Sequence, residues 1–393
     1  MKHNLGHTIA AAALGLASIA HAQTSPSTPI KIGVVTPLSG TYAGIGQTVR
    51  WGLELATAEI NASGGVLGRK LELLLEDEEA NPAVAVQKAE KLIQIAKVNL
   101  LTGTVNSGST LAVGQLAERN NVLASTTVSY SDAITGDKCS PNLFRVNARA
   151  EQQAITLAAY VAKVKPKARV FYIGPDYEMG RSSVAAFKLY AEKAGLQSVG
   201  EFLAPIDSKD YTQYFGQLRA ARPDVIYAAV AGNDTVRLLT QLQEFGLLRN
   251  VLVTGNAGVI NSQNVVAVGT AGEGFISGNN YSPKIDTAEN KRFVASYKAA
   301  YKADPDGFAA DSYGLVYLYK QAVEKAGSTD TDKVRAALKD LSWMTPQGTK
   351  TLRGGDHQAI QDMVVVAVRK GEFDVVGKVP GAESIGPDAC ARF

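Results

Sequence analysis

Hydroxyl side chains are concentrated in residues 102–110, which read Thr-Gly-Thr-Val-Asn-Ser-Gly-Ser-Thr. The segment follows an expected strand and opens an expected helix, so the hydroxyls of Ser107, Ser109 and Thr110 lie beside the free amides of a helix N-terminus. Those amides and the positive end of the helix dipole suit an anion such as a carboxylate. Ordinary helix capping by Ser107 or Ser109 explains the same residues equally well.

Four further loops leave expected strands at the same end, namely residues 126–132, 174–180, 231–234 and 255–257. In parallel α/β sheets, ligands bind beyond the carboxyl ends of the strands. The aromatic ring of Tyr177 and the flexible thioether of Met179 would pack against an apolar part of a ligand. Each loop taken alone is more often structural than functional, and only their convergence predicts one binding site.

Signatures of catalysis are missing from the sequence. It has no Gly-x-x-x-x-Gly-Lys-Ser/Thr or Gly-x-Ser-x-Gly motif, and Gly44-x-Gly46 lacks a third glycine at Val49. Three of the four histidines precede residue 23, which leaves His357 alone and excludes a histidine-based metal cluster. The acidic run 76–79 is more typical of a solvated turn than of a cation site. We therefore expect no catalytic residue, no cofactor and no metal.

The composition is that of a globular protein, with 393 residues of which 46% are hydrophobic and 20% charged. This length predicts two domains. A formal net charge of +3 argues against a nucleic-acid partner, which selects for strongly basic surfaces. No segment after residue 22 approaches the roughly 20 apolar residues of a membrane helix, so no membrane span is expected.

The N-terminal residues predict export. Lys2 supplies a positive charge, Thr8–Ala20 is an apolar run too short to span a bilayer, and Ala20-His21-Ala22 is a small-x-small cleavage pattern. We expect a signal peptide over residues 1–22, a flexible polar leader over residues 23–29, and a periplasmic product. A buried N-terminal helix is the alternative.

The sequence contains only two cysteines, Cys139 and Cys390. An oxidising compartment favours a disulfide between them, and two free thiols are the alternative. The bridge would tie the C-terminal tail to the first half of the chain.

Short β-branched runs alternate with helices of apolar periodicity, a pattern that predicts parallel sheets. The expected strands are 31–36, 71–75, 98–102 and 122–126, followed by 170–173, 199–203, 225–230 and 251–254. The rhythm restarts after Arg145, which indicates two lobes of similar construction. Beyond Gly278, helices at 287–302, 308–325 and 331–340 come without strands between them, and a strand pair at 363–368 and 373–376 closes the pattern.

Helices without strands of their own must pack on a sheet that already exists, so the chain is expected to return to the first lobe. We assign residues 30–148 and 279–350 to lobe 1, residues 149–278 and 351–378 to lobe 2, and residues 379–393 to a C-terminal tail. Several crossings between the lobes imply a hinge.

Several motifs together resemble the type I periplasmic binding proteins of the branched-chain amino acid ABC importers, over essentially the whole mature chain. They are Ile32–Gly40, Ala58–Asn61 before Gly64–Gly68, Asp77 with Asn81-Pro82, Asp176-Tyr177-x-x-Gly180, Pro223–Tyr227, and Glu273-Gly274. The resemblance implies two Rossmann-like, doubly wound α/β lobes joined by a three-crossover hinge. It also implies a non-enzymatic binding protein that closes around a solute and delivers it to an inner-membrane ABC permease.

The resemblance also implies a set of ligand-binding residues. Ser107 matches the serine that grips the ligand carboxylate, and Val128 and Tyr130 match contacts from the next loop. Met179, with Tyr177 nearby, falls where amino acid binders place a ligand-facing tyrosine. The other expected members are Ile45, which faces the pocket, with Tyr42 just before it, and Ser109, Thr110, Gly232, Asn233, Asn256 and Ala257.

Departures from the amino acid binders bear on the ligand. Their glutamate that pairs with the ligand ammonium has no counterpart in Gly255-Asn256-Ala257-Gly258, and Tyr130 replaces a threonine that helps to hold the same group. A buried ammonium without a carboxylate partner is costly. Asp234 would substitute, although an Asp at a helix start is more often a cap.

We therefore favour a carboxylate ligand without an α-ammonium. Residues 132–139, residues 356–358 and the cysteine near the tail are similar to members that bind aromatic acids. Branched-chain amino acids are the alternative ligand, and a ligand-sensing receptor module on the same fold is the alternative function.

Overall fold

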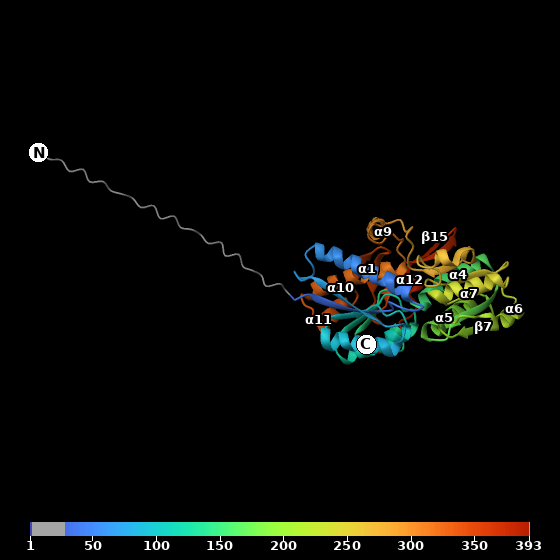
Figure 1. The fold of residues 1–393 in the computed structure, drawn as a ribbon, viewed down its shortest axis with the longest axis horizontal. Helices are drawn as coiled ribbons and strands as arrows, with labels where there is room; N and C mark the ends of the chain where they lie inside the picture. The colour runs from blue at the N-terminus through green and yellow to red at the C-terminus, as the bar shows by residue number, and fades with distance from the viewer. Residues whose placement is uncertain (2–27, 393) are drawn as a thin grey trace.

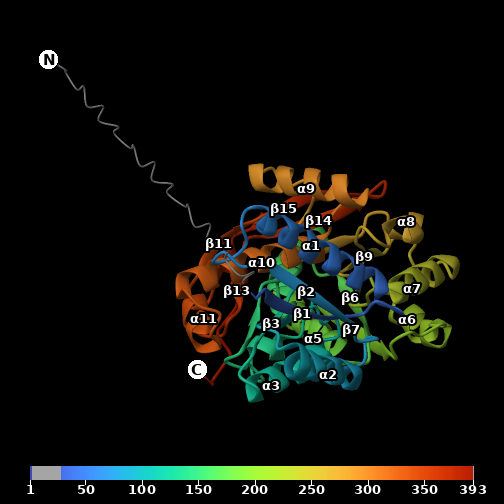
Figure 2. The ribbon, with the colours of Figure 1, turned by 60° about the vertical axis from the view of Figure 1, so that its left-hand side comes forward.

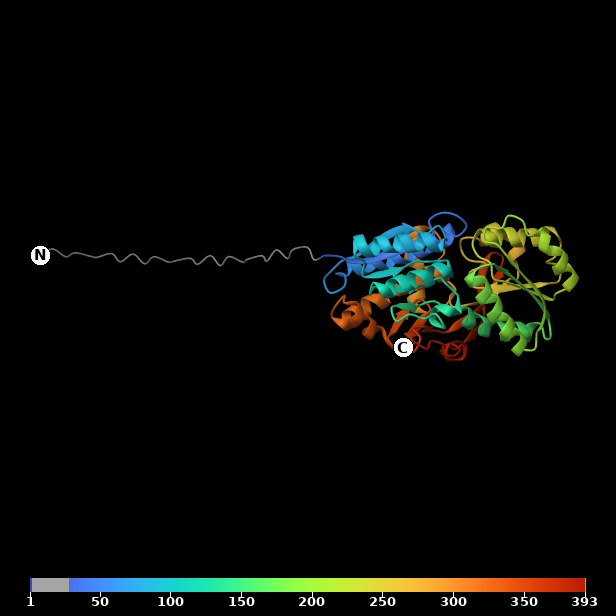
Figure 3. The same ribbon diagram turned by 90° about the horizontal axis from the view of Figure 1, so that it is seen from below.

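The computed structural model describes Met1 and residues 28–392. The expected signal peptide and most of the expected leader lie outside the described residues. Two sheets, each flanked by helices, form two lobes that lie side by side (Figure 3). No helix in the described part of the chain is long and apolar enough to cross a membrane.

The first sheet is entirely parallel and has the order β2-β1-β3-β4-β5. Its strands are β1 (Ile30–Thr36), β2 (Leu71–Asp77), β3 (Leu100–Thr102), β4 (Leu123–Thr126) and β5 (Leu143–Arg145). The helices between them are α1 (Ala43–Ala62), α2 (Pro82–Lys91) and α3 (Ser107–Arg119). The start of α2 follows from its sequence, because Asn81 caps the amides of Ala83 and Val84 and Pro82 needs no amide partner.

The second sheet has seven strands in the order β15-β14-β10-β9-β8-β6-β7. Figure 1 labels its two outermost strands, β7 and β15, and Figure 2 also labels β6, β9 and β14. Its parallel strands are β6 (Arg169–Pro175), β7 (Gln197–Ala204), β8 (Val225–Ala228), β9 (Leu252–Asn256) and β10 (Ile276–Asn279). The antiparallel pair β14 (Met363–Arg369) and β15 (Glu372–Val379) extends it beyond β10. Its helices are α4 (Ala150–Val164), α5 (Glu178–Lys193), α6 (Phe215–Ala221), α7 (Asn233–Glu244) and α8 (Val265–Val268).

The late helices pack on the first lobe, as the sequence predicted. They are α9 (Ala288–Tyr301), α10 (Gly307–Ala326) and α11 (Thr331–Leu338). The long α10 lies along α1 and also contacts α11 and β11, so most of its residues are buried. A small antiparallel sheet that we did not predict follows, with β11 (Ser342–Thr345), β12 (Gly348–Leu352) and β13 (Ala359–Ile360).

The chain passes between the two large sheets three times. The crossings follow β5, follow β10, and lie between β13 and β14. Residues 351–360 pair with β11 and β12 or, at Gln358, with Arg145 of the first lobe. We therefore propose to move the third crossing from residues 350–351 to Gln361–Asp362, because the intervening residues are bonded to the first lobe.

The C-terminal tail returns to the first lobe through the disulfide that the sequence predicted. Cys139 and Cys390 are bonded with their Cα atoms 5.7 Å apart, and the described residues contain no free cysteine. Arg392 adds an ion pair with Glu118 at the end of α3, at 2.7 Å. A short helix, α12 (Gly381–Ser384), packs on α4 of the second lobe before this point. The tail therefore contacts both lobes.

Candidate functional site

The N-terminus of α3 has a cap other than the two serines considered above. Asn106 precedes the helix, and its Oδ1 accepts from the amide of Gly108 at 2.8 Å. Ser107 is fully buried, and its Oγ accepts from the amide of Ser131, in the loop after β4, at 3.3 Å. Capping therefore does not explain Ser107, whose hydroxyl still has a proton to donate.

Ser109 and Thr110 face the interior of the first lobe. The Oγ1 atom of Thr110 lies 2.7 Å from Oγ1 of Thr104 and 2.6 Å from Oγ of Ser129. The hydroxyl of Ser109 lies close enough to Glu78 to lower the pKa of its carboxyl, without forming a well-shaped hydrogen bond. The partners of both hydroxyls lie within the first lobe, and we propose that Ser109 and Thr110 support the loop rather than contact a ligand.

Glu78 corrects the interpretation of the acidic run as a solvated turn. Its side chain is fully buried, and its Oε1 accepts from the amide of Val105 at 2.7 Å. Burial raises the pKa of this carboxyl to about 7. Glu79 is exposed as expected, and Glu76 pairs with Lys91. No group of three or more His, Cys, Asp or Glu within the described residues is arranged to hold a metal ion.

The expected residues of the two lobes meet directly. The hydroxyls of Tyr42, just before α1, and Tyr177, just before α5, lie 3.3 Å apart. Gly232 has a φ of 59°, and a Cβ atom added there would lie 2.3 Å from the carbonyl oxygen of Thr41, so only glycine fits. The amide of Asn233 donates to that carbonyl at 3.2 Å. Gly232 and Asn233 thus contact the opposite lobe through their backbones.

Further hydrogen bonds hold the lobes together at the loop after β4. Ser131 donates to Oε1 of Glu178 at 2.7 Å, and the amide of Asp132 donates to Oγ of Ser182 at 2.9 Å. Thr41 donates to Asp207 at 2.7 Å on the other side of Tyr42. These bonds between surfaces of different lobes define a closed arrangement.

A third loop of the expected site follows β9. The side-chain amide of Asn256 donates to the sulfur of Met179 at 3.6 Å, and its Oδ1 accepts from the amide of Gly258. The amide of Ala257 donates to Gln153 at 2.8 Å. Asn256 therefore shapes its own turn, while Ala257 presents a methyl group towards the space between the lobes.

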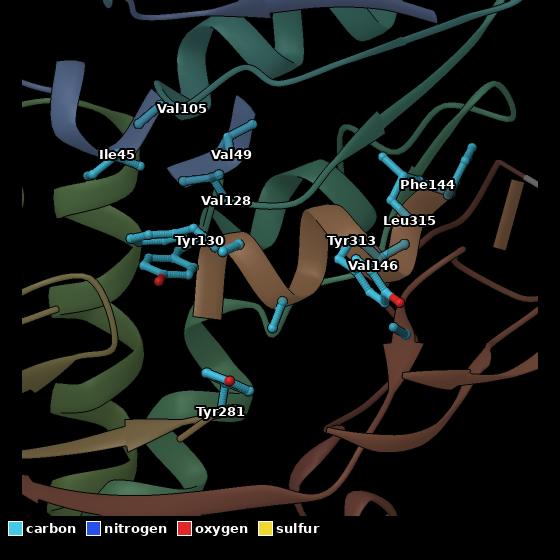
Figure 4. Packing of buried hydrophobic residues seen from close by; sticks show 14 of the residues in the cluster. Ile45, Val49, Val105, Val128, Tyr130, Phe144, Val146, Tyr281, Tyr313 and Leu315 are labelled. Atoms are coloured by element: carbon cyan, nitrogen blue, oxygen red, sulfur yellow. The ribbon is translucent and has the colours of Figure 1, made fainter. Parts of the chain in front are cut away.

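Ile45, Val105, Val128 and Tyr130 line one side of this interface in Figure 4. Tyr130 stacks on Phe308 with ring centroids 6.3 Å apart. Tyr130 is almost completely buried, and burial raises the pKa of its hydroxyl well above the ordinary value. The ring of Tyr130 therefore separates the end of the interface near α3 from the end near the hinge.

A hollow lies at the hinge end, between the lobes. Its lining includes Tyr130 and Ala257 from the expected set, and Asn261, Ser262, Asn279, Asp306 and Phe308, which the sequence did not indicate. The space open to the centres of water-sized molecules is about 30 Å³, enough for about two waters. A larger ligand can enter only if the contacts between the lobes part.

Two carboxylates line this hollow, and Asp306 is the one that is not paired with a lysine. It caps α10 by accepting from the amide of Ala309 at 2.9 Å, and its other oxygen accepts from Ser262 at 3.3 Å. Burial raises the pKa of Asp306 to about 6. None of residues 102–110 lines the hollow, so Asp306 is set apart from the N-terminus of α3.

Asp234, the other candidate partner for an ammonium, is occupied within its own lobe. Its Oδ2 accepts from the amide of Asp207 at 2.9 Å, and its Oδ1 pairs with Arg237 at 3.0 Å. Asp234 is not the N-cap of α7, because the residue in that position is Gly232.

A buried arginine that the sequence did not single out positions the loop after β4. Arg145 donates to the carbonyls of Ser129 at 3.1 Å and Ser131 at 2.8 Å, and to the hydroxyl of Thr135. Burial lowers the pKa of Arg145 to about 9. With its donors directed at these groups, Arg145 holds the loop after β4 in place.

A model of the family described as periplasmic binding protein matches residues 29–372. The chain belongs to the periplasmic binding protein family. A Leu/Ile/Val-binding protein of Rhizobium johnstonii is 30% identical to this binding protein over 84% of this chain and 87% of its own. The family is one of non-enzymatic solute-binding proteins, so the resemblance inferred from the sequence is confirmed.

Solved structures place the fold in the same group. A solute-binding protein of an ABC transporter from Rhodopseudomonas palustris BisB5, in complex with 3,4-dihydroxybenzoic acid, has 26% identity and a TM-score of 0.83, covering 90% of this chain and 98% of its own. One from R. palustris in complex with benzoate has 25% identity and a TM-score of 0.85, covering 92% and 99%. The predicted type I α/β fold is confirmed, and the binding protein is a solute-binding component of an ABC transporter.

Proposed function

We propose that this periplasmic binding protein binds a small organic acid, with an aromatic carboxylate favoured, and releases it to an inner-membrane ABC permease. The observation that carries the ligand class is the loop after β9, where Asn256 and Ala257 stand in place of an acid. An α-ammonium placed there would be buried without a carboxylate.

The contacts at the two ends of the interface support an acid with an aromatic body. Ser107 and the amides of α3 offer donors to a carboxylate, and the aromatic rings of Tyr42, Tyr130 and Tyr177 offer apolar faces. Benzoate and 3,4-dihydroxybenzoic acid are the ligands named for two structural neighbours.

Hydrophobic amino acids are the second candidate, because the curated relative of Rhizobium johnstonii is named for Leu, Ile and Val. Asp306 is the one carboxylate in the hollow that does not already pair with a cation. Asp306 is set apart from the N-terminus of α3, where we propose that the ligand carboxylate binds. A hydrogen-bond donor far from that carboxylate, such as a ring hydroxyl, would therefore reach Asp306 better than an α-ammonium would.

A thermal-shift screen separates the two candidates. Benzoate, 4-hydroxybenzoate, leucine and valine are each added to the purified protein at several concentrations, and the ligand is checked for chemical change afterwards. We expect the aromatic acids to raise the melting temperature in a concentration-dependent way. A shift with leucine or valine alone would favour the amino acid candidate, and conversion of the ligand would contradict a binding function.

We also propose a periplasmic location, which the expected signal peptide over residues 1–22 supports. Fractionation of cells that express the full-length chain tests it. The protein should appear in the osmotic-shock fraction with residues 1–22 removed, and an intact N-terminus in the cytoplasmic fraction would contradict the proposal.

A further inference from the structure

Parts of the hinge meet at one buried ion pair. Lys350 on β12 donates to Asp311 on α10 at 2.5 Å, and the two side chains are only 1% and 2% exposed. Figure 4 shows Val146, in the first crossing, beside Tyr313 and Leu315 of the same helix. The pair therefore lies where the chain passes from one lobe to the other.

The pair bonds directly to two crossings and, through the side chain of Asn280, to the third. The ammonium group of Lys350 also donates to the carbonyl of Val146, in the first crossing, at 2.9 Å. Asp311 accepts from the side-chain amide of Asn280, in the second crossing, at 2.8 Å. That amide also donates to Gln361, in the third crossing, at 3.2 Å. Segments separated by more than 200 residues in the sequence are thus joined through two charged groups and the side-chain amide of Asn280.

General stability does not account for such a pair. Removing two charges from water is costly, and apolar side chains of similar volume often fill such a site at no loss of stability. The side-chain amide of Gln347 donates a further hydrogen bond to Asp311, at 2.8 Å. Directional bonds fix relative positions in a way that apolar contacts do not, which points to a geometric role.

We propose that the Asp311–Lys350 pair is the pivot of the hinge, which holds the three crossings at one point while the lobes turn about it. The inference rests on the proposed movement of the lobes but not on the identity of the ligand. Asp311 and Lys350 act here as positioning residues. Without them the crossings would bend independently, and the lobes would sample a wider range of relative orientations.

The test compares ligand-free proteins, because Asp311 also lines the hollow. Lys350→Met alone leaves a buried carboxylate without its partner and is expected to unfold more easily. The informative variant therefore neutralises both groups as Asp311→Asn with Lys350→Met. Lys320→Met is the matched control, because it breaks the more exposed pair of Lys320 with Glu324 on the same helix.

Hydrogen exchange of the amides at residues 146–149, 280–282 and 361–363 is the main readout, and small-angle scattering reports the spread of lobe orientations. In the neutralised variant we expect exchange to rise at least tenfold in all three crossings together, and the scattering curve to broaden towards open forms. The control should match the wild type in both measurements.

Two results would overturn the pivot. One is faster exchange confined to β12 and α10 with the crossings unchanged, and the other is a scattering curve identical to that of the wild type. Since no ligand is added, a failed ligand screen would count against the proposed function and leave this measurement standing.

Discussion

At the scale of single residues, sequence patterns placed the candidate loops at the interface between the lobes but did not assign the roles of their individual side chains. The hydroxyl-rich segment does open α3 at the interface, but Asn106 caps the helix and Thr110 turns inward to Thr104. The direction in which the hydroxyl of Thr110 points depends on neighbours such as Ser129, and the spacing of residues in the sequence does not reveal those neighbours. The burial of Glu78 was not predicted for the same reason, since the tertiary fold decides which of the four acidic residues 76–79 is buried.

Ser107→Ala is expected to weaken binding of an acid ligand by about 10- to 150-fold, because a hydrogen bond to a charged group contributes about 1.5–3 kcal/mol. The helix keeps its cap, since the cap residue is Asn106. Calorimetric titration with the acid that gives the largest thermal shift measures the effect. Ser109→Ala is the matched control, because its hydroxyl faces Glu78. Equal affinities for wild type and Ser107→Ala would remove Ser107 from the site.

Glu78 predicts a pH-dependent part of the stability. Its pKa rises from 4.5 to about 7 on folding, so the folded state holds this proton more tightly than the unfolded state. The contribution is complete below pH 4.5 and is lost as the pH rises through 7, by about 3 kcal/mol. Glu78→Gln retains the acceptor for the amide of Val105 and should lack this loss.

Denaturant unfolding of wild type and Glu78→Gln at pH 4.5 and pH 8 measures that difference. Asp306 also has a raised pKa, but it is present in both proteins and cancels in the comparison. If the free energy of unfolding falls by the same amount in both proteins over this range, Glu78 does not titrate as inferred.

At the scale of elements, long periodic segments were predictable, whereas of the short buried strands some were predicted and others were missed. The sequence indicates α1, α2, α10 and the edge pair β14–β15, because each repeats its pattern over several turns or alternations. Strands β5 and β10 have three and four residues, too few to show a period, and they are strands because they complete a sheet. The small sheet β11–β13 was missed for the same reason.

Contact between the loop after β4 and the start of α5 is expected to slow ligand release. Ser182 accepts from the amide of Asp132 and donates to its carboxylate, at 2.9 and 3.2 Å. Ser182→Ala removes both bonds, and a net loss of about 1 kcal/mol corresponds to about fivefold faster dissociation. Stopped-flow displacement of the ligand measures the rate.

Ser208→Ala provides the control for that measurement, because Ser208 donates to Pro205 within its own lobe. Its dissociation rate should equal that of the wild type. An unchanged rate in Ser182→Ala would mean that the bonds between the lobes are already broken in the complex.

At the scale of the whole molecule, the motif set predicted two lobes and a hinge, and the late helices predicted a return to the first lobe. The position of the third crossing was not predictable, because residues 351–360 stay with the first lobe through pairing partners such as Arg145 that lie about 200 residues earlier. The course of the tail was predictable from Cys139 and Cys390 once an exported protein was assumed.

The disulfide makes the tail a fourth connection between the lobes, and this predicts a large effect on stability. After β15 the chain is held by Arg149, which donates to the carbonyls of Ile385 and Pro387, and it then reaches Cys139 across a sequence separation of 251 residues. Closing a loop of this length restricts the unfolded chain, by up to about 5 kcal/mol in the chain-entropy treatment.

Replacement of both cysteines by serine should therefore lower the free energy of unfolding by several kcal/mol, and reduction of the wild-type protein should have a similar effect. Arg392→Ala separates the covalent bond from docking of the tail. It removes the partly exposed ion pair with Glu118 and a hydrogen bond to the carbonyl of Cys139, and such exposed contacts contribute little to stability. If the serine variant and Arg392→Ala unfold at the same denaturant concentration, the covalent link adds nothing to docking, and the constraint on the unfolded chain is not what stabilises this protein.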